Sequence, residues 1–277
     1  MAHKRLSKHS SEFDYPTIIM ISILAYVVTT ALHEFCGHAV ACSLLSGTIT
    51  ELNAFYIDCQ YEAISDLSIR LIAIAGPLAS LLTGVITLLL VRRLRKLSPH
   101  MVYFLWLLGT ISLMTATSYL IFSGITGVGD FGISRDGALF QMSPSWLWRI
   151  VLTVVGIIAY GCVVINSLKS LNSFLGGENP KRTIQAKTLT LISYLSGCIM
   201  AVLVGLLNPK GFEIILLSSL ASTAGGTSAL LWMMRFLKAD EVNAQPLIKI
   251  TRNYYWIGVG LIFLGLYAIV FGPSLYL

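Results

Sequence analysis

The stretch "PTIIMISILAYVVTTALHEFCGHAVACSLL", residues 16–45, decides what kind of fold this chain adopts. It is almost entirely apolar, and it is longer than the ~20 residues that an α-helix needs to cross a bilayer. Three ionisable residues, His33, Glu34 and His38, nevertheless lie within it. A charged side chain inside a membrane span costs about 2.5–3.5 kcal/mol on insertion scales, so this group requires a compensating partner.

Further apolar segments follow the first one. They cover residues 68–91, 101–123, 147–168, 188–208, 211–234 and 254–273. The chain of 277 residues is 56% hydrophobic and 12% charged, which is about half the charged share of an average soluble domain. The sequence therefore predicts an all-α, polytopic membrane protein with about seven transmembrane helices.

The distribution of basic residues predicts the orientation of these helices. The N-terminus and every second connection carry them: Lys4, Arg5, Lys8; Arg92, Arg93, Arg95, Lys96; Lys169, Lys181, Arg182, Lys187; Arg235, Lys238, Lys249, Arg252. The connection 46–67 has no Lys or Arg. By the positive-inside rule, we expect a multi-pass protein of the cell membrane with a cytoplasmic N-terminus and an outer C-terminus. The net charge of +6 is then explained mostly by the basic residues on the cytoplasmic side of the helices. The expected surroundings are the lipid bilayer, and no nucleic-acid partner is expected.

The cysteines give no sign of a disulfide framework. Their number is odd, no C-x-x-C pair occurs, and four of the five lie in apolar segments: Cys36, Cys42, Cys59, Cys162 and Cys198. Free cysteine packs as a small hydrophobic residue. We therefore expect all of them to be apolar packing residues.

The polar residues of the first span indicate a metal site. Zinc binds neutral imidazoles and carboxylates, and in the helical motif H-E-x-x-H two histidines four residues apart bind it while the glutamate acts as general base. Here His33 and His38 are five residues apart, and on a regular helix they would diverge by about 140°. A π-bulge restores the register. The sequence therefore predicts a helix that is locally widened at residues 33–38, with Gly37 easing the distortion.

The third ligand is expected to be a carboxylate. The three other histidines lie in the polar N-terminus or at the cytoplasmic end of the third span. The glycine-rich segment "SGITGVGDFGISRDG", residues 123–137, follows the outer end of the third span and offers Asp130 and Asp136. Asp130 is preferred because it comes first and closest to the membrane, and Asp136 is the alternative.

Depth in the membrane gives an argument that is independent of the motif. At ~1.5 Å per residue, His33 lies about 25 Å beyond Pro16, in the outer part of the bilayer. The sequence "AGPLAS", residues 75–80, lies in the outer half of the second span, and Asp130 follows the third. The three segments are thus expected at one level. Gly76-Pro77 is expected either to break the second helix there or to form a packing kink.

The order His33-Glu34, then Gly37-His38 and "AVA", followed by "AGPLAS", resembles the site-2 protease family of intramembrane zinc metallopeptidases. The resemblance covers about residues 29–137. It implies a zinc ion at the two histidines, Glu34 as the catalytic base, and an aspartate from a later span as third ligand. The inserted residue gives H-E-x-x-G-H, which is similar to the zinc helix of the soluble dipeptidyl peptidase III family. The family's usual asparagine-proline and leucine-aspartate-glycine run is missing.

These interpretations divide the chain into a cytoplasmic tail (1–15), a metalloprotease core (16–137) and four further helices of unassigned role (138–277). The expected activity is zinc-dependent hydrolysis of peptide bonds in membrane or membrane-proximal proteins and peptides. Two non-catalytic alternatives stay open, namely a degenerate protease homologue and a transporter or accessory factor. A coupled carrier would show ionisable residues in several spans, whereas only the first span has a group of them.

Overall fold

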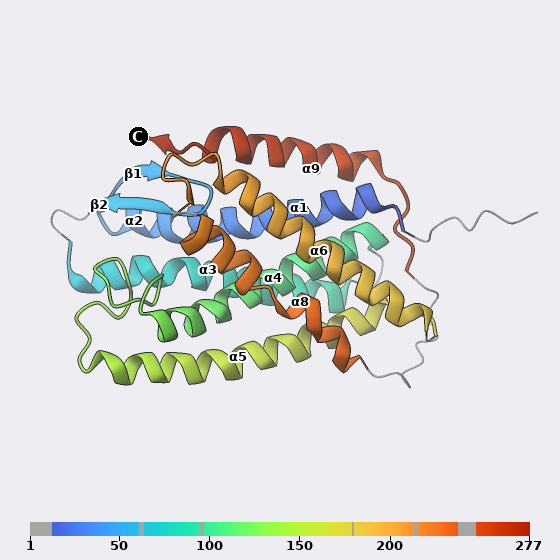
Figure 1. Ribbon diagram of the computed structural model, residues 1–277, viewed down its shortest axis with the longest axis horizontal. Helices are drawn as coiled ribbons and strands as arrows, with labels where there is room; N and C mark the ends of the chain where they lie inside the picture. The colour runs from blue at the N-terminus through green and yellow to red at the C-terminus, as the bar shows by residue number, and fades with distance from the viewer. Residues whose placement is uncertain (1–12, 61–63, 95–96, 179, 213–214, 238–247) are drawn as a thin grey trace, which may run out of the picture.

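The computed structural model describes residues 13–60, 64–94, 97–178, 180–212, 215–237 and 248–277, and it is mostly helical. Six helices in these ranges are long and apolar enough to cross a membrane: Tyr15–Leu44, Asp66–Arg93, Pro99–Thr126, Ser145–Phe174, Lys181–Gly205 and Tyr254–Phe271. They lie along one another in a single bundle (Figure 1). The chain is thus a multi-pass membrane protein, as predicted.

The first span consists of three consecutive helices, α1 (Tyr15–Ala31), η1 (Leu32–Ala39) and α2 (Val40–Leu44). Its start follows from local chemistry, because the Asp14 side chain accepts a hydrogen bond from the Thr17 backbone and a proline occupies the first turn. The next three spans are single helices, α3 (Asp66–Arg93), α4 (Pro99–Thr126) and α5 (Ser145–Phe174).

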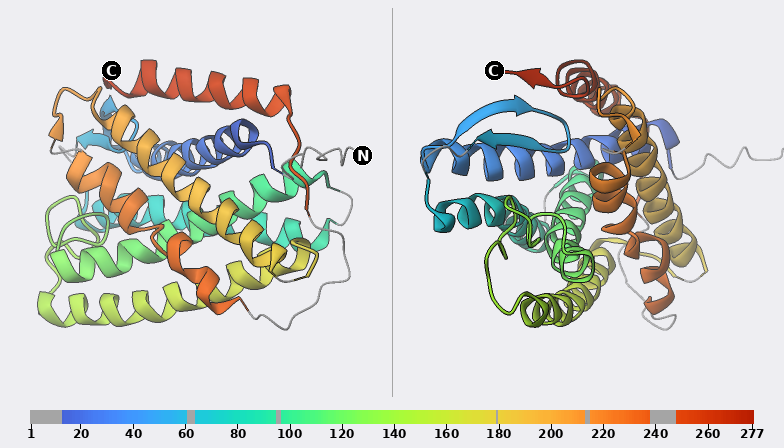
Figure 2. Two further views of the ribbon diagram at one scale, coloured as in Figure 1. Left: turned by 45° about the vertical axis from the view of Figure 1, so that its right-hand side comes forward. Right: turned by 60° about the vertical axis from the view of Figure 1, so that its left-hand side comes forward.

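The last two spans complete the bundle around the first. Helix α6 (Lys181–Gly205) and helix α9 (Tyr254–Leu266), which continues as η4 (Tyr267–Phe271), both pack on α1. Figure 2 shows α9 at the rim of the bundle, with the C-terminus at the same end of the bundle as the end of the first span. The hydrophobic core includes residues from both sides of the boundary expected at 137, such as Ile21, Trp106 and Leu189.

The span expected at 211–234 is not one regular helix in the described residues. It is divided into a π-helix η2 (Ile215–Gly225), a short α8 (Ala229–Trp232) and a 3-10 turn η3 (Met233–Phe236), while residues 213–214 lie outside the described part. The sequence "STAGGTS", residues 222–228, explains the division. Glycine weakens a helix interior, and the Thr223 and Thr227 hydroxyls donate to backbone carbonyls one turn earlier.

A small antiparallel sheet was not part of the all-α prediction. Strands β1 (Thr48–Leu52) and β2 (Ile57–Gln60) form a hairpin, and β3 (Leu275–Tyr276) pairs with the other edge of β1, in the order β2-β1-β3. Strands this short give no clear periodicity in the sequence. The sheet joins the connection between the first and second spans to the C-terminus. We call this end of the bundle the sheet end.

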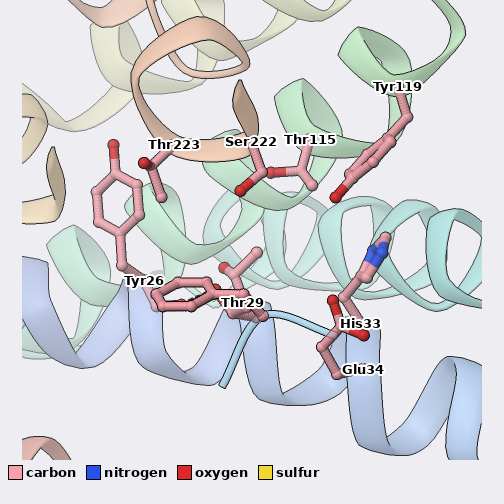
Figure 3. Close-up of a pocket in the computed structure, with 10 residues that line it drawn as sticks. Tyr26, Thr29, His33, Glu34, Thr115, Tyr119, Ser222 and Thr223 are labelled. Atoms are coloured by element: carbon pink, nitrogen blue, oxygen red, sulfur yellow. Dashed lines mark hydrogen bonds between the residues drawn. The ribbon is translucent and has the colours of Figure 1, made fainter. Parts of the chain in front are cut away.

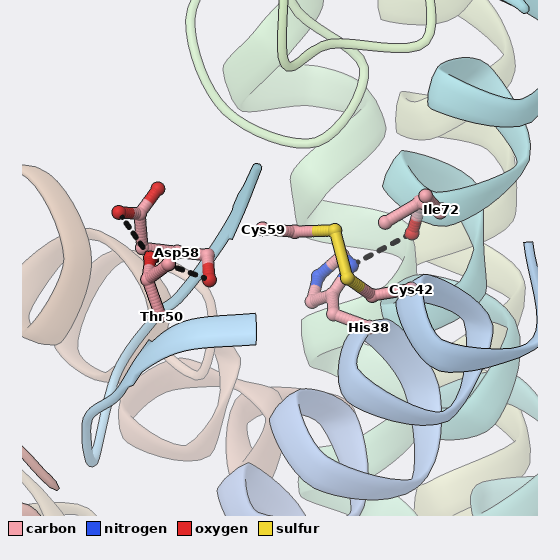
Figure 4. Close-up of a disulfide and its surroundings, with 6 residues drawn as sticks. All are labelled: His38, Cys42, Thr50, Asp58, Cys59 and Ile72. Carbon is pink, nitrogen blue, oxygen red and sulfur yellow. Dashed lines mark hydrogen bonds between the residues drawn. A yellow bond between two sulfur atoms is a disulfide. The ribbon is translucent and has the colours of Figure 1, made fainter. Parts of the chain in front are cut away.

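The expectation that every cysteine is free was wrong for two of them. Cys42, near the end of α2, forms a disulfide with Cys59 of β2 across a separation of 17 residues (Figure 4). The chain reverses at Ser46, whose φ of 65° is left-handed, and at Gly47, where a Cβ would collide with both sulfur atoms. This reversal brings together two cysteines that are far apart in the sequence. Cys36, Cys162 and Cys198 are free, as predicted.

Candidate metal centre

The predicted widening of the first helix is confirmed. Residues Leu32–Ala39 form a π-helix between two α-helical segments. This geometry turns His33 and His38 to the same side, and their Nε2 atoms lie 3.3 Å apart. A spacing that would separate the imidazoles on a regular helix therefore brings them together here.

Asp130 completes a group of three convergent side chains. Its Oδ2 lies 3.2 Å from His33 Nε2, and its Oδ1 lies 3.6 Å from His38 Nε2. One ligand atom of each residue falls within 4.8 Å of the others. Asp136, the alternative, is exposed and is not part of the group.

The glycine-rich connection folds so that Asp130 points back into the bundle. Gly127 and Gly129 adopt left-handed φ values of 79° and 86°, which residues with a Cβ rarely adopt. The Asp130 carbonyl accepts a hydrogen bond from Ala138 N at 2.8 Å, and Phe131 N donates to Ser123 Oγ at 3.3 Å. The connection is thus a tight structure held at the C-terminal end of α4.

Helix α3 orients both imidazoles. His38 Nδ1 lies 2.8 Å from the Ile72 carbonyl, which can only accept, so Nδ1 donates its hydrogen and the neutral ring presents the lone pair of Nε2 to the group. His33 Nδ1 lies 2.9 Å from the Ser80 hydroxyl. Such outer hydrogen bonds to the second ring nitrogen are typical of histidines that bind metals.

The "AGPLAS" sequence brings α3 against the π-helix. A Cβ on Gly37 would lie 2.5 Å from Gly76 Cα, and a Cβ on Gly76 would lie 2.7 Å from His33 Nε2. Gly76-Pro77 does not break the helix, because α3 runs unbroken with Pro77 inside it. Gly76 instead serves close packing against the π-helix. The role of Gly37 here is close approach between the two helices.

Glu34 lies next to His33 and is 4% exposed. It faces a narrow cavity, which we call the chamber (Figure 3). Most of its lining residues are polar: Tyr26, Thr29, Thr30, His33, Glu34, Phe55, Thr115, Tyr119, Ser222 and Thr223. Within the described part of the chain, no residue forms a hydrogen bond with the Glu34 carboxylate. The carboxylate is therefore available to a ligand in the chamber.

Sequence reasoning missed several residues around the group. The Tyr119 ring stacks on His33 with centroids 5.2 Å apart and planes 17° apart. Ser222 and Thr223 come from η2, in the part of the chain without an assigned role. Nothing in the sequence distinguishes these residues from ordinary packing residues of apolar helices. The only sequence signal for the Ser80 contact was the position of this residue at the end of "AGPLAS".

The group fits a divalent metal on the chemistry of its donors. Two imidazole nitrogens and one carboxylate converge, and Asp130 Oδ2 is a buried oxygen without a hydrogen-bond partner in the described structure. A buried carboxylate oxygen without a donor is costly unless a cation is bound. Two histidines and one carboxylate, with an open position, form the ligand set of catalytic zinc sites, and the same set also binds iron(II).

Comparisons of the chain with protein-family models, with curated proteins and with solved structures gave no significant match. The fold and the site therefore define its class, a multi-pass membrane protein with a candidate His-His-Asp metal centre inside the bundle.

Proposed function

We propose that this protein is a membrane-embedded zinc metallopeptidase of the site-2 protease type. Its substrates would be peptide bonds of membrane or membrane-proximal proteins and peptides. The observation that carries the proposal is the convergence of His33, His38 and Asp130 beside the buried carboxylate of Glu34. A structural metal site would not need an additional carboxylate that is free of hydrogen bonds.

The chemistry is divided between the metal and the chain. Zinc bound at this ligand set would polarise the scissile carbonyl and lower the pKa of a water molecule towards ~7. Glu34 faces the chamber, where its carboxylate would accept a proton from water and pass it to the leaving amine. Hydrogen bonds from α3 would keep the two imidazoles oriented throughout.

We place the protein in the cell membrane with the N-terminus in the cytoplasm and the sheet end outside. Two observations support this orientation. Disulfides persist in oxidising compartments, and the Cys42–Cys59 disulfide lies at the sheet end. Basic residues follow or flank the opposite ends of the helices, such as Arg92 and Arg93 at the end of α3 and Lys181 at the start of α6.

Substitution of Glu34 by Gln tests the proposed activity. The variant keeps the shape of the side chain but removes its basicity, so it should retain zinc and lose cleavage of labelled casein by at least about 100-fold, the lower range of general-base contributions. Casein is unfolded, so it does not need the local unwinding that a helical substrate requires. Cleavage would be followed by release of labelled peptides from protein in detergent micelles.

The matched control is Glu51→Gln, which makes the same chemical change in β1, outside the group and the chamber. It should cleave casein as the unmodified protein does. Cleavage by Glu34→Gln at the unmodified rate would contradict the proposal. Retained zinc without cleavage by any form would favour a non-catalytic membrane protein.

A further inference from the structure

The chamber is small, mostly polar and bordered by His33 of the candidate metal centre. It offers about 20 Å³ to the centres of water molecules, and a polar cavity needs only ~10–15 Å³ of such space for one. Most hydroxyls around it already have partners. Tyr26 pairs with Thr227 at 2.7 Å, and Thr29 pairs with Ser112 at 3.2 Å.

Tyr119 differs from these residues. Its hydroxyl forms no hydrogen bond with any residue in the described part of the chain. Figure 3 shows that it points into the chamber on the side of Glu34 and His33. A phenol turned into a polar cavity without a partner has a donor available for a ligand.

The ring of Tyr119 fixes the direction of this hydroxyl. It stacks almost parallel on the His33 imidazole, and α4 holds it from the opposite side of the chamber. His33 is itself hydrogen-bonded to Ser80, so the phenol rests on an imidazole whose orientation is fixed. A donor that is oriented before substrate arrives requires no reorganisation during the reaction.

We propose that Tyr119 is a catalytic residue of the metallopeptidase proposed above, on which this inference rests. Its hydroxyl donates a hydrogen bond to the carbonyl oxygen of the scissile peptide, and this bond strengthens as the oxygen becomes an oxyanion. The proton stays on the phenol, and Glu34 alone carries the proton transfer. The hydroxyl thereby adds a neutral donor beside the Glu34 carboxylate and the metal-facing imidazole of His33.

Two substitutions on the same helix separate catalysis from packing. Tyr119→Phe keeps the ring on His33 and removes a hydroxyl that has no hydrogen-bond partner among the described residues. Tyr103→Phe removes a buried hydroxyl that contacts Ser193 at 2.6 Å and Ser22 at 3.1 Å, far from the chamber. A packing role for both tyrosines predicts that the two variants lose stability rather than catalytic rate.

We expect Tyr119→Phe to lower kcat on labelled casein by about 100-fold, the loss typical of one oxyanion donor, with KM, zinc content and thermal stability unchanged. Tyr103→Phe should show a lower unfolding temperature and an unchanged kcat. A phosphinic dipeptide, whose tetrahedral phosphinate mimics the transition state, should bind Tyr119→Phe more weakly by the same factor. Its binding would be measured by calorimetry.

The outcomes distinguish this inference from the proposed function. An unmodified protein that cleaves casein, together with a Tyr119→Phe variant that has unchanged kcat and phosphinate affinity, would overturn the catalytic role alone. Loss of zinc from Tyr119→Phe would also overturn it, because the hydroxyl would then support the metal centre rather than the reacting carbonyl oxygen. An unmodified protein that binds neither zinc nor phosphinate would overturn both proposals.

Discussion

At the scale of single residues, the sheet end depends on one buried carboxylate. Glu51 of β1 is 5% exposed, it accepts a hydrogen bond from the Tyr56 hydroxyl, and it lies 3.2 Å from Lys210 Nζ. The Lys210 ammonium also lies 4.4 Å from the centre of the Tyr56 ring. Three segments remote in sequence thus meet at this side chain, since Ser274 near the C-terminus also contacts Tyr56.

These contacts set the pH dependence of the sheet end. Burial raises the pKa of Glu51, but hydrogen bonds from Ser274, Tyr56 and Lys210, together with the charge of Lys210, outweigh burial and hold the pKa below its usual value. A carboxyl group with a lowered pKa stabilises the folded state above its unfolded pKa of about 4.3, and this contribution is lost as the pH falls through the lower folded value.

Glu51→Gln should therefore lower the unfolding free energy at pH 7 by about 1–2 kcal/mol, because Lys210 is half exposed and water weakens its attraction. The difference between the variant and the unmodified protein should shrink as the pH falls below about 4. Thermal unfolding in detergent at pH 7, 5 and 3 measures both effects. A difference that is constant over this range would show that the charge of Glu51 contributes nothing.

At the scale of elements, the site depends on the crossing of the π-helix and α3. Gly37 and Gly76 allow the two backbones to meet, and this contact brings Ile72 and Ser80 within reach of the imidazoles. A methyl group at Gly76 would occupy the space beside His33 Nε2. The glycine pair therefore allows the two helices to pack closely and also positions the candidate metal centre.

Gly76→Ala should abolish metal binding and destabilise the protein by about 1–3 kcal/mol, the usual cost of overpacking. Gly161→Ala is the matched control, because a Cβ at Gly161 in α5 meets nothing within 4 Å. That control should keep the metal and gain up to about 1 kcal/mol from helix propensity. Metal content after purification and thermal unfolding give the two readouts. Full metal content in Gly76→Ala would refute the crossing as described.

Much of the site at this scale could be predicted from the sequence, and the reason is geometric. The spacing of His33 and His38 is incompatible with one ligand-bearing face unless the helix widens, so local sequence determined the π-helix. Asp130 could be preferred over Asp136 because the number of residues between each aspartate and the end of the third span can be counted in the sequence. Tyr119 could not be found, because its place depends on how α4 lies against η1, which no local pattern encodes.

At the scale of the whole molecule, long apolar segments predicted the spans, but not the features that cross between them. The Cys42–Cys59 disulfide and the pairing of β3 with β1 depend on where distant segments meet. The irregular segment 215–236 differs from the expected single span because its Ser, Thr and Gly residues favour local backbone bonding over a continuous helix. That segment contributes Ser222 and Thr223 to the chamber.

The metal content of the purified protein tests the central claim most directly. We expect one zinc ion per chain in the unmodified protein by mass spectrometry, and the same amount in Asp136→Asn, whose side chain is exposed and outside the group. Asp130→Asn should lose the metal or bind it at least about tenfold more weakly, since an amide is a poorer ligand for zinc than a carboxylate. A metal-free unmodified protein, or equal zinc in both variants, would contradict the account.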